Sequence, residues 1–295
     1  MIQSLYLGRV AYDEGLRLQD ELVALRYEGR IGNTLLLLEH PPVLTLGRNA
    51  KRVNVLASDE MLARRGVTLH EINRGGDVTY HGPGQLVGYP IFDLRSLRGP
   101  SNGRLGPVDF VRQIEEALIR LCGHFGVPAK RIAGLTGVWC AAGSAAGAGT
   151  SGESGAGASG AGASGAGAAE RKIGAIGIHV SRGITSHGFA FNVTTDLRDF
   201  QLIHPCGITD KPVTSLELEV ADREALPDLE SVAHLAARQF GLVFDQQILA
   251  VESLDALRRQ AAQAATREFP AQDTPLRVPP EVEKLQGLPA HPSRA

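Results

Sequence analysis

The sequence predicts an α/β protein of the α+β kind, in which helices pack on a mixed, largely antiparallel sheet. Short β-rich runs, bounded by glycine or proline and joined by short turns, make up much of the chain. Longer segments with apolar residues at helical spacing interrupt these runs. Strands and helices do not alternate strictly, so a parallel sheet built from βαβ units is not favoured.

The first half of the chain begins with a helix and continues with strands. Apolar residues recur at helical spacing in "DELVALRYEG", which predicts a helix over residues 20–29. Strands are predicted at residues 33–40, 42–47 and 85–94, because each run is short, rich in β-forming residues and bounded by turn residues.

A second helix is predicted over residues 107–126. Pro107 suits a first helical turn and Gly126 suits a stop. Cys122 lies beside the apolar stripe, so we expect it to be a small core residue. The stripe on one face consists of Phe110, Val111, Ile114, Leu118 and Leu121.

The second half of the chain has three more strand runs and two late helices. The strands are predicted at residues 137–140, 173–180 and 184–193. Residues 228–241 and 251–269 have the composition of helices.

One core domain is expected over residues 1–250, interrupted by a Gly/Ala/Ser insert at 141–169. Such a tract has no core-forming side chains and cannot offset the entropy of ordering, so we expect a flexible surface loop. A C-terminal helix over 251–267 and a Pro-rich, charged tail at 268–295, which we expect to be disordered, complete the chain.

Composition excludes several classes of function. The formal net charge of −2 over 295 residues favours no polyanion, so no nucleic-acid partner is expected. No apolar run approaches the ~18 residues that span a bilayer, and a signal peptide is not recognisable, so we expect a cytoplasmic protein without a membrane partner. The three cysteines, Cys122, Cys140 and Cys206, lack CxxC spacing, which argues against a disulfide framework and a structural zinc site.

A glycine-rich segment, "NRGGDVTYHGPGQLVGYP", occupies residues 73–90. Its glycines allow sharp turns or a close approach of backbone to a ligand, although two tight turns would look similar. The P-loop and GxGxxG patterns are missing, so these nucleotide motifs are excluded. Arg74 and His81 are the polar residues among the glycines, and the remaining histidines, including His179, His187 and His204, lack ligand spacing; we assign no metal and no cofactor.

Two residues suggest acyl chemistry. Cys206 lies between a proline and a glycine in "LIHPCGITDKPVTSLE", and Lys172 begins the apolar run "KIGAIGIHV". Lys172 could be an ordinary edge residue whose ammonium reaches solvent. If it reaches Cys206, its charge would favour the thiolate, and a desolvated lysine amine could accept the thiol proton. Such a pair suits thiolate attack on a thioester followed by aminolysis of the enzyme-bound thioester.

These segments closely resemble the signature of the lipoyl(octanoyl) transferase family. The resemblance runs in order through residues 74–90, "GVW", 172–193 and 202–216, and covers residues 1–250 apart from the insert. It implies a catalytic domain like that of biotin and lipoate protein ligases. It also implies that Cys206 is the nucleophile and Lys172 its activating residue. The implied substrate-binding residues are Arg74, Gly75, Gly76, Asp77, Val78, Thr79, Tyr80, His81, Ala175, Ile176, Gly177, Gly188, Phe189 and Ala190.

The resemblance further implies a reaction. Octanoyl or lipoyl would pass from acyl carrier protein to Cys206 and then to a lysine of apo lipoyl domains, in the first step of endogenous protein lipoylation. Acceptors would be the E2 subunits of 2-oxoacid dehydrogenases and the glycine cleavage H protein. We expect Gly188 and Gly76 to lie where a bulky side chain would block the acyl chain.

Three alternatives remain open at this point. An ATP-dependent lipoate or biotin protein ligase would activate a free acid, and a non-catalytic acyl-carrier or lipoyl-domain binding module would tolerate loss of Cys206 or Lys172. A cysteine hydrolase is the weakest, since nothing suggests how water would be admitted. The insert departs from the family, in which "TGVW" and "RKIGAIG" are joined by a short connection.

Overall fold

The computed structural model describes residues 1–99, 103–141, 169–204 and 211–264. Its main feature is an eight-stranded sheet in the order β11-β1-β2-β6-β10-β9-β8-β7. β1 pairs in parallel with β11 and β2, and the remaining neighbours are antiparallel. The predicted mixed, largely antiparallel sheet is therefore confirmed. Its strands are β1 (Ile2–Arg9), β2 (Asn33–Glu39), β6 (Gln85–Ile91), β7 (Ala129–Ile132), β8 (Leu135–Cys140), β9 (Arg171–Ser181), β10 (Ile184–Asn192) and β11 (Ile248–Ala250).

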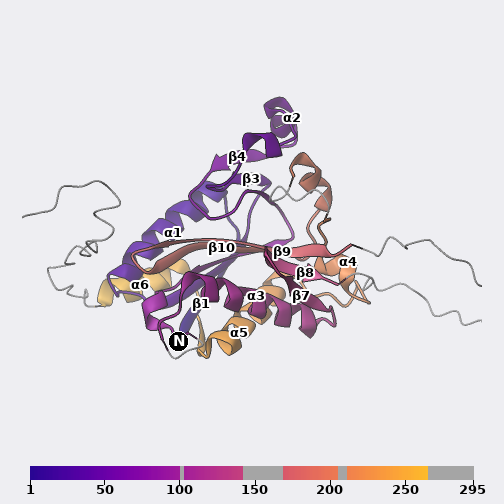
Figure 1. Ribbon diagram of the computed structural model, residues 1–295. Coiled ribbons are helices and arrows are strands. Elements are labelled where there is room, and N and C mark those ends of the chain that lie inside the picture. Colours follow the sequence, from indigo (N-terminus) through magenta and orange to yellow (C-terminus); the bar gives the residue numbers. More distant parts are fainter. Residues whose placement is uncertain (100–102, 142–168, 205–210, 265–295) are drawn as a thin grey trace, which may run out of the picture.

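Helices cover both faces of this sheet (Figure 1). α3 (Pro107–His124) and α5 (Leu229–Phe244) pack on one face, and α1 (Tyr12–Tyr27) and α6 (Leu254–Gln263) on the other. The leucine run of β2 shows how one strand serves both layers. Leu35 and Leu37 belong to the core under α3 and α5, whereas Leu36 and Leu38 belong to the core under α1 and α6. Because side chains alternate along a strand, a continuous apolar run indicates burial on both faces.

A second, three-stranded sheet in the order β4-β3-β5 lies beside the large one (Figure 1). Its strands are β3 (Val43–Leu46), β4 (Thr68–Glu71) and β5 (Val78–His81), with the short helix α2 (Asp59–Arg64) nearby. Phe200 and Leu202 of a 3₁₀ turn (Leu197–Leu202) complete its small core. The remaining short elements are 3₁₀ turns at Arg52–Asn54 and Leu94–Ser96 and the one-turn helix α4 (Leu216–Glu219).

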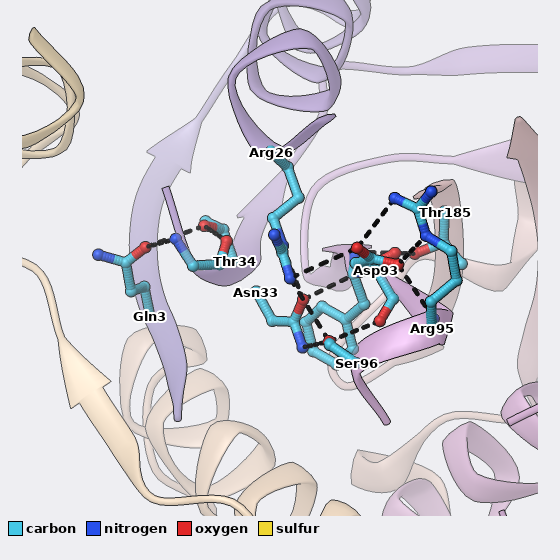
Figure 2. Close-up of polar contacts among 10 residues, drawn as sticks. Gln3, Arg26, Asn33, Thr34, Asp93, Arg95, Ser96 and Thr185 are labelled. Carbon is cyan, nitrogen blue, oxygen red and sulfur yellow. Dashed lines mark hydrogen bonds and ion pairs between the residues drawn. The ribbon is translucent and has the colours of Figure 1, made fainter. Parts of the chain in front are cut away.

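A buried carboxylate fixes one end of the large sheet (Figure 2). The Arg95 guanidinium donates two hydrogen bonds to the Asp93 carboxylate, at 2.8 and 3.0 Å, and the Arg26 guanidinium lies 3.9 Å from that carboxylate. Burial alone would raise the pKa of Asp93, but the hydrogen bonds and charge of Arg95 outweigh it and hold the pKa below its ordinary value. Asn33 of β2 accepts hydrogen bonds from the Asp93 backbone and from Arg26. The network therefore joins α1, β2 and the end of β6, at the opposite end of β6 from Gln85.

Several predicted elements have different bounds in the structure. The helix expected at 20–29 spans Tyr12–Tyr27, and the one expected at 251–267 spans Leu254–Gln263. The helix at 107–126 ends at His124, with Gly126 at a φ of +72°, as its stop signal suggested. Cys122 is buried in the core, and so are all residues of the predicted stripe except Val111, which is half-buried. The strands β1, β4, β5, β7 and β11 were not predicted.

The expected insert and tail lie almost entirely outside the described residues. In the part of the chain that is described, no helix combines the length and apolar character that crossing a bilayer requires.

Candidate active site

A narrow cavity lies between the two sheets, where β5 faces β9 and β10. Val87 and Tyr89 of β6 and Tyr12 at the start of α1 complete its wall. It is lined by Tyr12, Arg74, Gly76, Asp77, Thr79, His81, Val87, Tyr89, Ala175, Ile176, Gly177, His187, Gly188, Phe189 and Ala190. Eleven of the fourteen substrate-binding residues predicted from the sequence are in this set. A separate surface cleft between α5 and the β1–β11 edge holds the exposed pair Glu230 and His234, 3.7 Å apart, and lies far from the predicted residues.

The three predicted residues that do not line the cavity lie behind its wall. Val78 and Tyr80 alternate with Thr79 and His81 along β5, so they point into the core of the small sheet. Gly75 donates its backbone N–H to Ile178 of β9 at 3.0 Å. The strand alternation thus divides a segment that sequence similarity presents as continuous.

Arg74 is a buried part of the wall. Its guanidinium donates to the Thr45 carbonyl at 2.8 Å, to the Thr45 hydroxyl at 2.9 Å and to the Gly75 carbonyl at 3.0 Å. A Cβ on Gly47 would lie 2.8 Å from an Arg74 nitrogen and 2.5 Å from the Gly76 carbonyl oxygen. The glycine at position 47 therefore allows the loop carrying Arg74 to pack directly on the end of β3.

Two neutral histidines, His81 and His187, line the cavity, and a third, His40, packs beside His81. Burial lowers the pKa of His81 to about 3, and lowers those of His40 and His187 to about 4. His81 Nδ1 lies 2.8 Å from Gln85 Oε1. Because the Gln85 amide nitrogen donates to the Tyr80 carbonyl and to Asn192, its oxygen must accept, so His81 carries its proton on Nδ1.

Strand packing explains why position 188 is a glycine, which the sequence did not suggest. A Cβ there would lie 2.1 Å from the Gly88 carbonyl oxygen and 2.5 Å from Pro90 Cδ, both on β6. The missing side chain therefore allows β10 and β6 to approach closely. Gly188 also lines the cavity, so the expectation that a bulky side chain there would block the acyl chain stays a prediction. Gly76 differs, since it has a φ of +90° and its Cβ would meet only an Arg74 nitrogen, at 3.3 Å.

Lys172 lines a smaller cavity that continues from the first. Thr79, Ala175 and Ala190 line both. Lys172 is only 7% exposed, so the expectation of an ordinary edge residue reaching solvent is wrong. Its Nζ lies 5.0 Å from the centroid of the Trp139 ring, within the range of a cation–π contact.

A β-bulge turns Lys172 toward this cavity. Val138 pairs with Gly174 and Trp139 pairs with Lys172, which leaves Ile173 as an extra residue on β9. Ile173 belongs to the core under α3, and a Cβ on Gly174 would also face that core, 3.4 Å from Leu118. Ile173 and Gly174 thus both face the helices, which interrupts the usual alternation. As a result, Lys172 before them and Ala175 after them both face the cavity.

Gly137 provides the room that Lys172 needs. Its φ is +125°, and a Cβ there would lie 2.8 Å from Lys172 Cε and 2.5 Å from the Gly174 carbonyl oxygen. Gly137 also donates its backbone N–H to the buried carboxylate of Glu115 at 3.0 Å. These contacts make Gly137 a residue that positions Lys172.

Cys206 lies in residues 205–210, outside the described part of the chain, but the chain on both sides of it is placed. Before it, His204 donates its backbone N–H to Asn54 at 2.8 Å, and Asn54 donates its side-chain amide to Asp77 of the cavity wall at 2.7 Å. After it, Pro212 accepts from the Lys172 N–H at 2.8 Å and Thr214 donates to the Lys172 carbonyl at 2.9 Å.

An ion pair anchors the chain that follows. Arg171 donates to both oxygens of the buried Glu219, at 2.7 and 2.9 Å, and the Thr214 hydroxyl donates to the same carboxylate at 2.7 Å. Asn192 donates to the Thr214 carbonyl at 2.9 Å and accepts from Gln85, which is bonded to His81. A continuous hydrogen-bond chain thus connects the cavity wall to the segment beside Lys172.

Sequence reasoning missed several lining residues. Tyr12, Val87, Tyr89 and His187 line the main cavity, and Gln85 and Asn192 line the smaller one. Tyr12 and Val87 sit in ordinary helix and strand patterns that carry no signal. His187 precedes the predicted Gly188, but only its backbone conformation distinguishes it. Among the residues that the structure describes, no three His, Cys, Asp or Glu side chains gather into a group that could hold a metal ion.

Comparisons with known proteins identify the family. The lipoyl protein ligase A/B catalytic domain matches residues 11–241. The octanoyltransferase of Acidobacterium capsulatum is 61% identical over 254 residues, which cover 86% of this chain and 94% of that protein. The chain belongs to the octanoyltransferase family. The family resemblance predicted from the sequence is thereby confirmed, and the chain is an acyltransferase.

Other octanoyltransferases are also similar to this chain over most of its length. The one from Koribacter versatilis is 52% identical, covering 87% of this chain and 90% of that protein, and the one from Solibacter usitatus is 44% identical, covering 85% and 96%. Among solved structures, the bi-partite lipoate protein ligase of Thermoplasma acidophilum has a TM-score of 0.60 at 16% identity, covering 89% of this chain and 91% of that one. A lipoate-protein ligase A bound with ATP has a TM-score of 0.57 at 15% identity, with coverages of 89% and 93%. These similarities confirm the predicted ligase-like fold of this octanoyltransferase.

Proposed function

We propose that this octanoyltransferase moves an octanoyl or lipoyl group from acyl carrier protein to a lysine of apo lipoyl domains through a thioester on Cys206. One observation carries the assignment of the nucleophile. Phe200 and Val213, on either side of the segment that contains Cys206, line the same cavity as Lys172. The segment thus leaves from and returns to the place where a buried lysine faces the acyl cavity.

The reaction has two transfers. The Lys172 amine takes the proton of the Cys206 thiol, and the thiolate attacks the thioester carbonyl of the donor, whose thiol leaves with a proton returned by Lys172. The acceptor lysine amine then attacks the enzyme thioester, losing a proton to Lys172. Cys206 leaves as thiolate and an amide remains. The first step exchanges one thioester for another and the second is downhill, so no nucleotide is required.

The cavity accounts for recognition of the acyl chain. Val87, Ile176, Phe189 and the two alanines provide apolar contacts, and the histidines around them are neutral. Each buried methylene contributes about 0.8 kcal/mol, so a medium-length chain should bind far better than acetyl. Comparable transfer rates from acetyl and octanoyl carriers would contradict this assignment of the cavity.

The partners follow from the chemistry proposed. The donor would be octanoyl-acyl carrier protein, and the acceptors would be the lipoyl domains of 2-oxoacid dehydrogenase E2 subunits and the glycine cleavage H protein. We place this reaction in the cytoplasm, where a thiol nucleophile stays reduced. It would be the first step of endogenous protein lipoylation.

Intact-protein mass spectrometry after incubation with octanoyl-acyl carrier protein tests the proposal. Cys206→Ala should abolish the octanoyl adduct, whereas Cys140→Ala, the matched control, should keep it. Burial raises the pKa of Cys140 to about 12, so that thiol stays protonated. A hydroxylamine-sensitive adduct that persists in Cys206→Ala would refute the nucleophile assignment.

Lys172→Arg separates the two steps. Arginine keeps the positive charge that favours the Cys206 thiolate, so the variant should still load octanoate once the thiol proton passes to water. It cannot accept a proton from the acceptor amine, so it should fail to pass octanoate to an apo lipoyl domain. A ligase would instead require ATP and free octanoate and would accumulate no cysteine adduct. ATP-dependent transfer from free acid, with full activity in Cys206→Ala, would overturn the proposal in favour of a ligase.

A further inference from the structure

His187 stands between the acyl cavity and a second cleft. Residues on the far side that line this cleft include Leu16, Gln19, Val23, Ile72 and Asn73. His187 is the one lining residue that the two cavities share in the described part of the chain. The two spaces follow one another along α1, because Tyr12 lines the acyl cavity while Leu16 and Gln19, one and two turns later, line the cleft.

Two hydrogen bonds hold His187, one at its imidazole and one at its backbone. Its Nε2 lies 2.7 Å from Asn73 Oδ1, and its backbone N–H donates to Gln19 Oε1 at 2.7 Å. Its φ is +54°, a left-handed conformation that is unfavourable for a residue with a Cβ. The strain is sustained by these hydrogen bonds and by the pairing of His187 with Ile178 of β9. The side chain that separates the acyl cavity from the second cleft therefore belongs to a residue held in an uncommon backbone conformation.

The distance from the Lys172 end to His187 matches the length of an octanoyl group. Ala190 lies where the cavity of Lys172 joins the acyl cavity, and His187 is three residues away along β10, a rise of about 10 Å. Seven carbon–carbon bonds of about 1.5 Å at tetrahedral angles extend about 9 Å. A chain with its thioester near Lys172 would thus end with its methyl group against the imidazole.

We propose that His187, held by Asn73 and Gln19, is the floor of the acyl cavity and sets the longest acyl group that the enzyme accepts. This inference rests on the proposed acyl site. A dodecanoyl group would have to displace a buried imidazole and break its hydrogen bond to Asn73. With the imidazole absent, the additional carbons would enter the cleft along Leu16 and Val23.

The test compares loading of Cys206 from octanoyl-, decanoyl- and dodecanoyl-acyl carrier protein in wild type and His187→Gly. Glycine adopts the positive φ without strain, so this substitution relieves the backbone while removing the wall. We expect the dodecanoyl-to-octanoyl loading ratio to rise at least about tenfold. That is the factor obtained if only two of the four additional methylenes become buried. His187→Asn, which tolerates the same φ and shortens the side chain, should raise the decanoyl ratio and serves if the glycine variant is unstable.

Two controls locate the effect. His179→Ala enlarges the second cleft without touching the acyl cavity, so its length profile should remain that of wild type. Adding Leu16→Trp to His187→Gly should refill the cleft and remove the gain. An unchanged profile in a folded His187→Gly or His187→Asn variant, or equal loading of octanoyl and dodecanoyl by wild type, would overturn this inference while leaving the thioester proposal intact. Failure of wild type to load any chain would instead refute the proposed function.

Discussion

Replacing Gly137 by alanine tests how tightly the structure holds Lys172. The residue lies in β8 next to Val138, where β8 pairs with the bulged part of β9. The added methyl group would lie 2.5 Å from the Gly174 carbonyl oxygen and 2.8 Å from Lys172 Cε. It would therefore collide with the backbone of β9 and with the side chain of Lys172. The carbonyl belongs to the sheet and cannot turn aside, so the strands or the lysine must move.

Two costs add for this substitution. A φ of +125° is accessible to glycine but strained for alanine, by about 1–3 kcal/mol. Overpacking of a filled site typically costs about 1–3 kcal/mol more. We therefore expect Gly137→Ala to lower the free energy of unfolding by about 2–6 kcal/mol, a large part of a typical domain's stability.

Urea unfolding followed by circular dichroism measures the effect, with Gly134→Ala as the matched control. Gly134 has a φ of +78° in the preceding turn, and a Cβ there would have open space around it. The control should lose only about 1 kcal/mol, the conformational cost of a left-handed residue. Octanoyl loading should fall in Gly137→Ala and not in Gly134→Ala. Equal stabilities and equal loading in the two variants would refute the positioning role of Gly137.

Three further outcomes are expected. His81, His187 and His40, in and beside the cavity, have folded-state pKa values of about 3 to 4, below the ordinary 6.5. The unfolded chain therefore binds protons first, and the free energy of unfolding falls as pH drops below 6.5, by up to about 4 kcal/mol per pH unit. Flat urea midpoints between pH 6.5 and 5, above the range of ordinary carboxylates, would contradict their burial. Gly188→Ala should destabilise by about 3 kcal/mol or more, because its methyl group would force β10 from β6, whereas Gly123→Ala, with open space in α3, should stabilise by about 0.5–1 kcal/mol in the same denaturation assay. Deleting residues 143–167 should leave octanoyl transfer largely intact, because the segment offers no core-forming or catalytic side chain; an insoluble deletion variant would show a structural role.

The sequence predicted well those elements whose pattern is local. The stripe in α3, with a proline at its start and a glycine beyond its end, determined that helix almost to the residue. Strands that depend on distant partners left no such pattern. β11 has three residues and pairs with β1 at the other end of the chain, so only the tertiary structure defines it.

The candidate site was predictable as a set of segments but not as a geometry. Glycines mixed with polar residues marked the segments around Arg74 and Gly177. The bulge at Ile173, the reason for Gly188 and the role of His187 depend on strand register and on one positive φ, and neither can be read from residue types. A one-residue shift in β9 would turn Lys172 away from the cavity, although the sequence would look the same.

The pairing of β8 with β9 offers a place to divide the enzyme. Cys140, the last residue of β8, and Arg171, the first residue of β9, are opposite each other in that pair, so the chain enters and leaves the Gly/Ala/Ser insert at neighbouring strand ends. A cut within the insert would yield two fragments, the first carrying Arg74 and His81 and the second carrying Lys172, His187 and Cys206. Neither fragment holds a complete site, and β8 and β9 would have to reassociate to rebuild it. Octanoyl transfer by the mixed halves would then report on whatever brings the two fragments together.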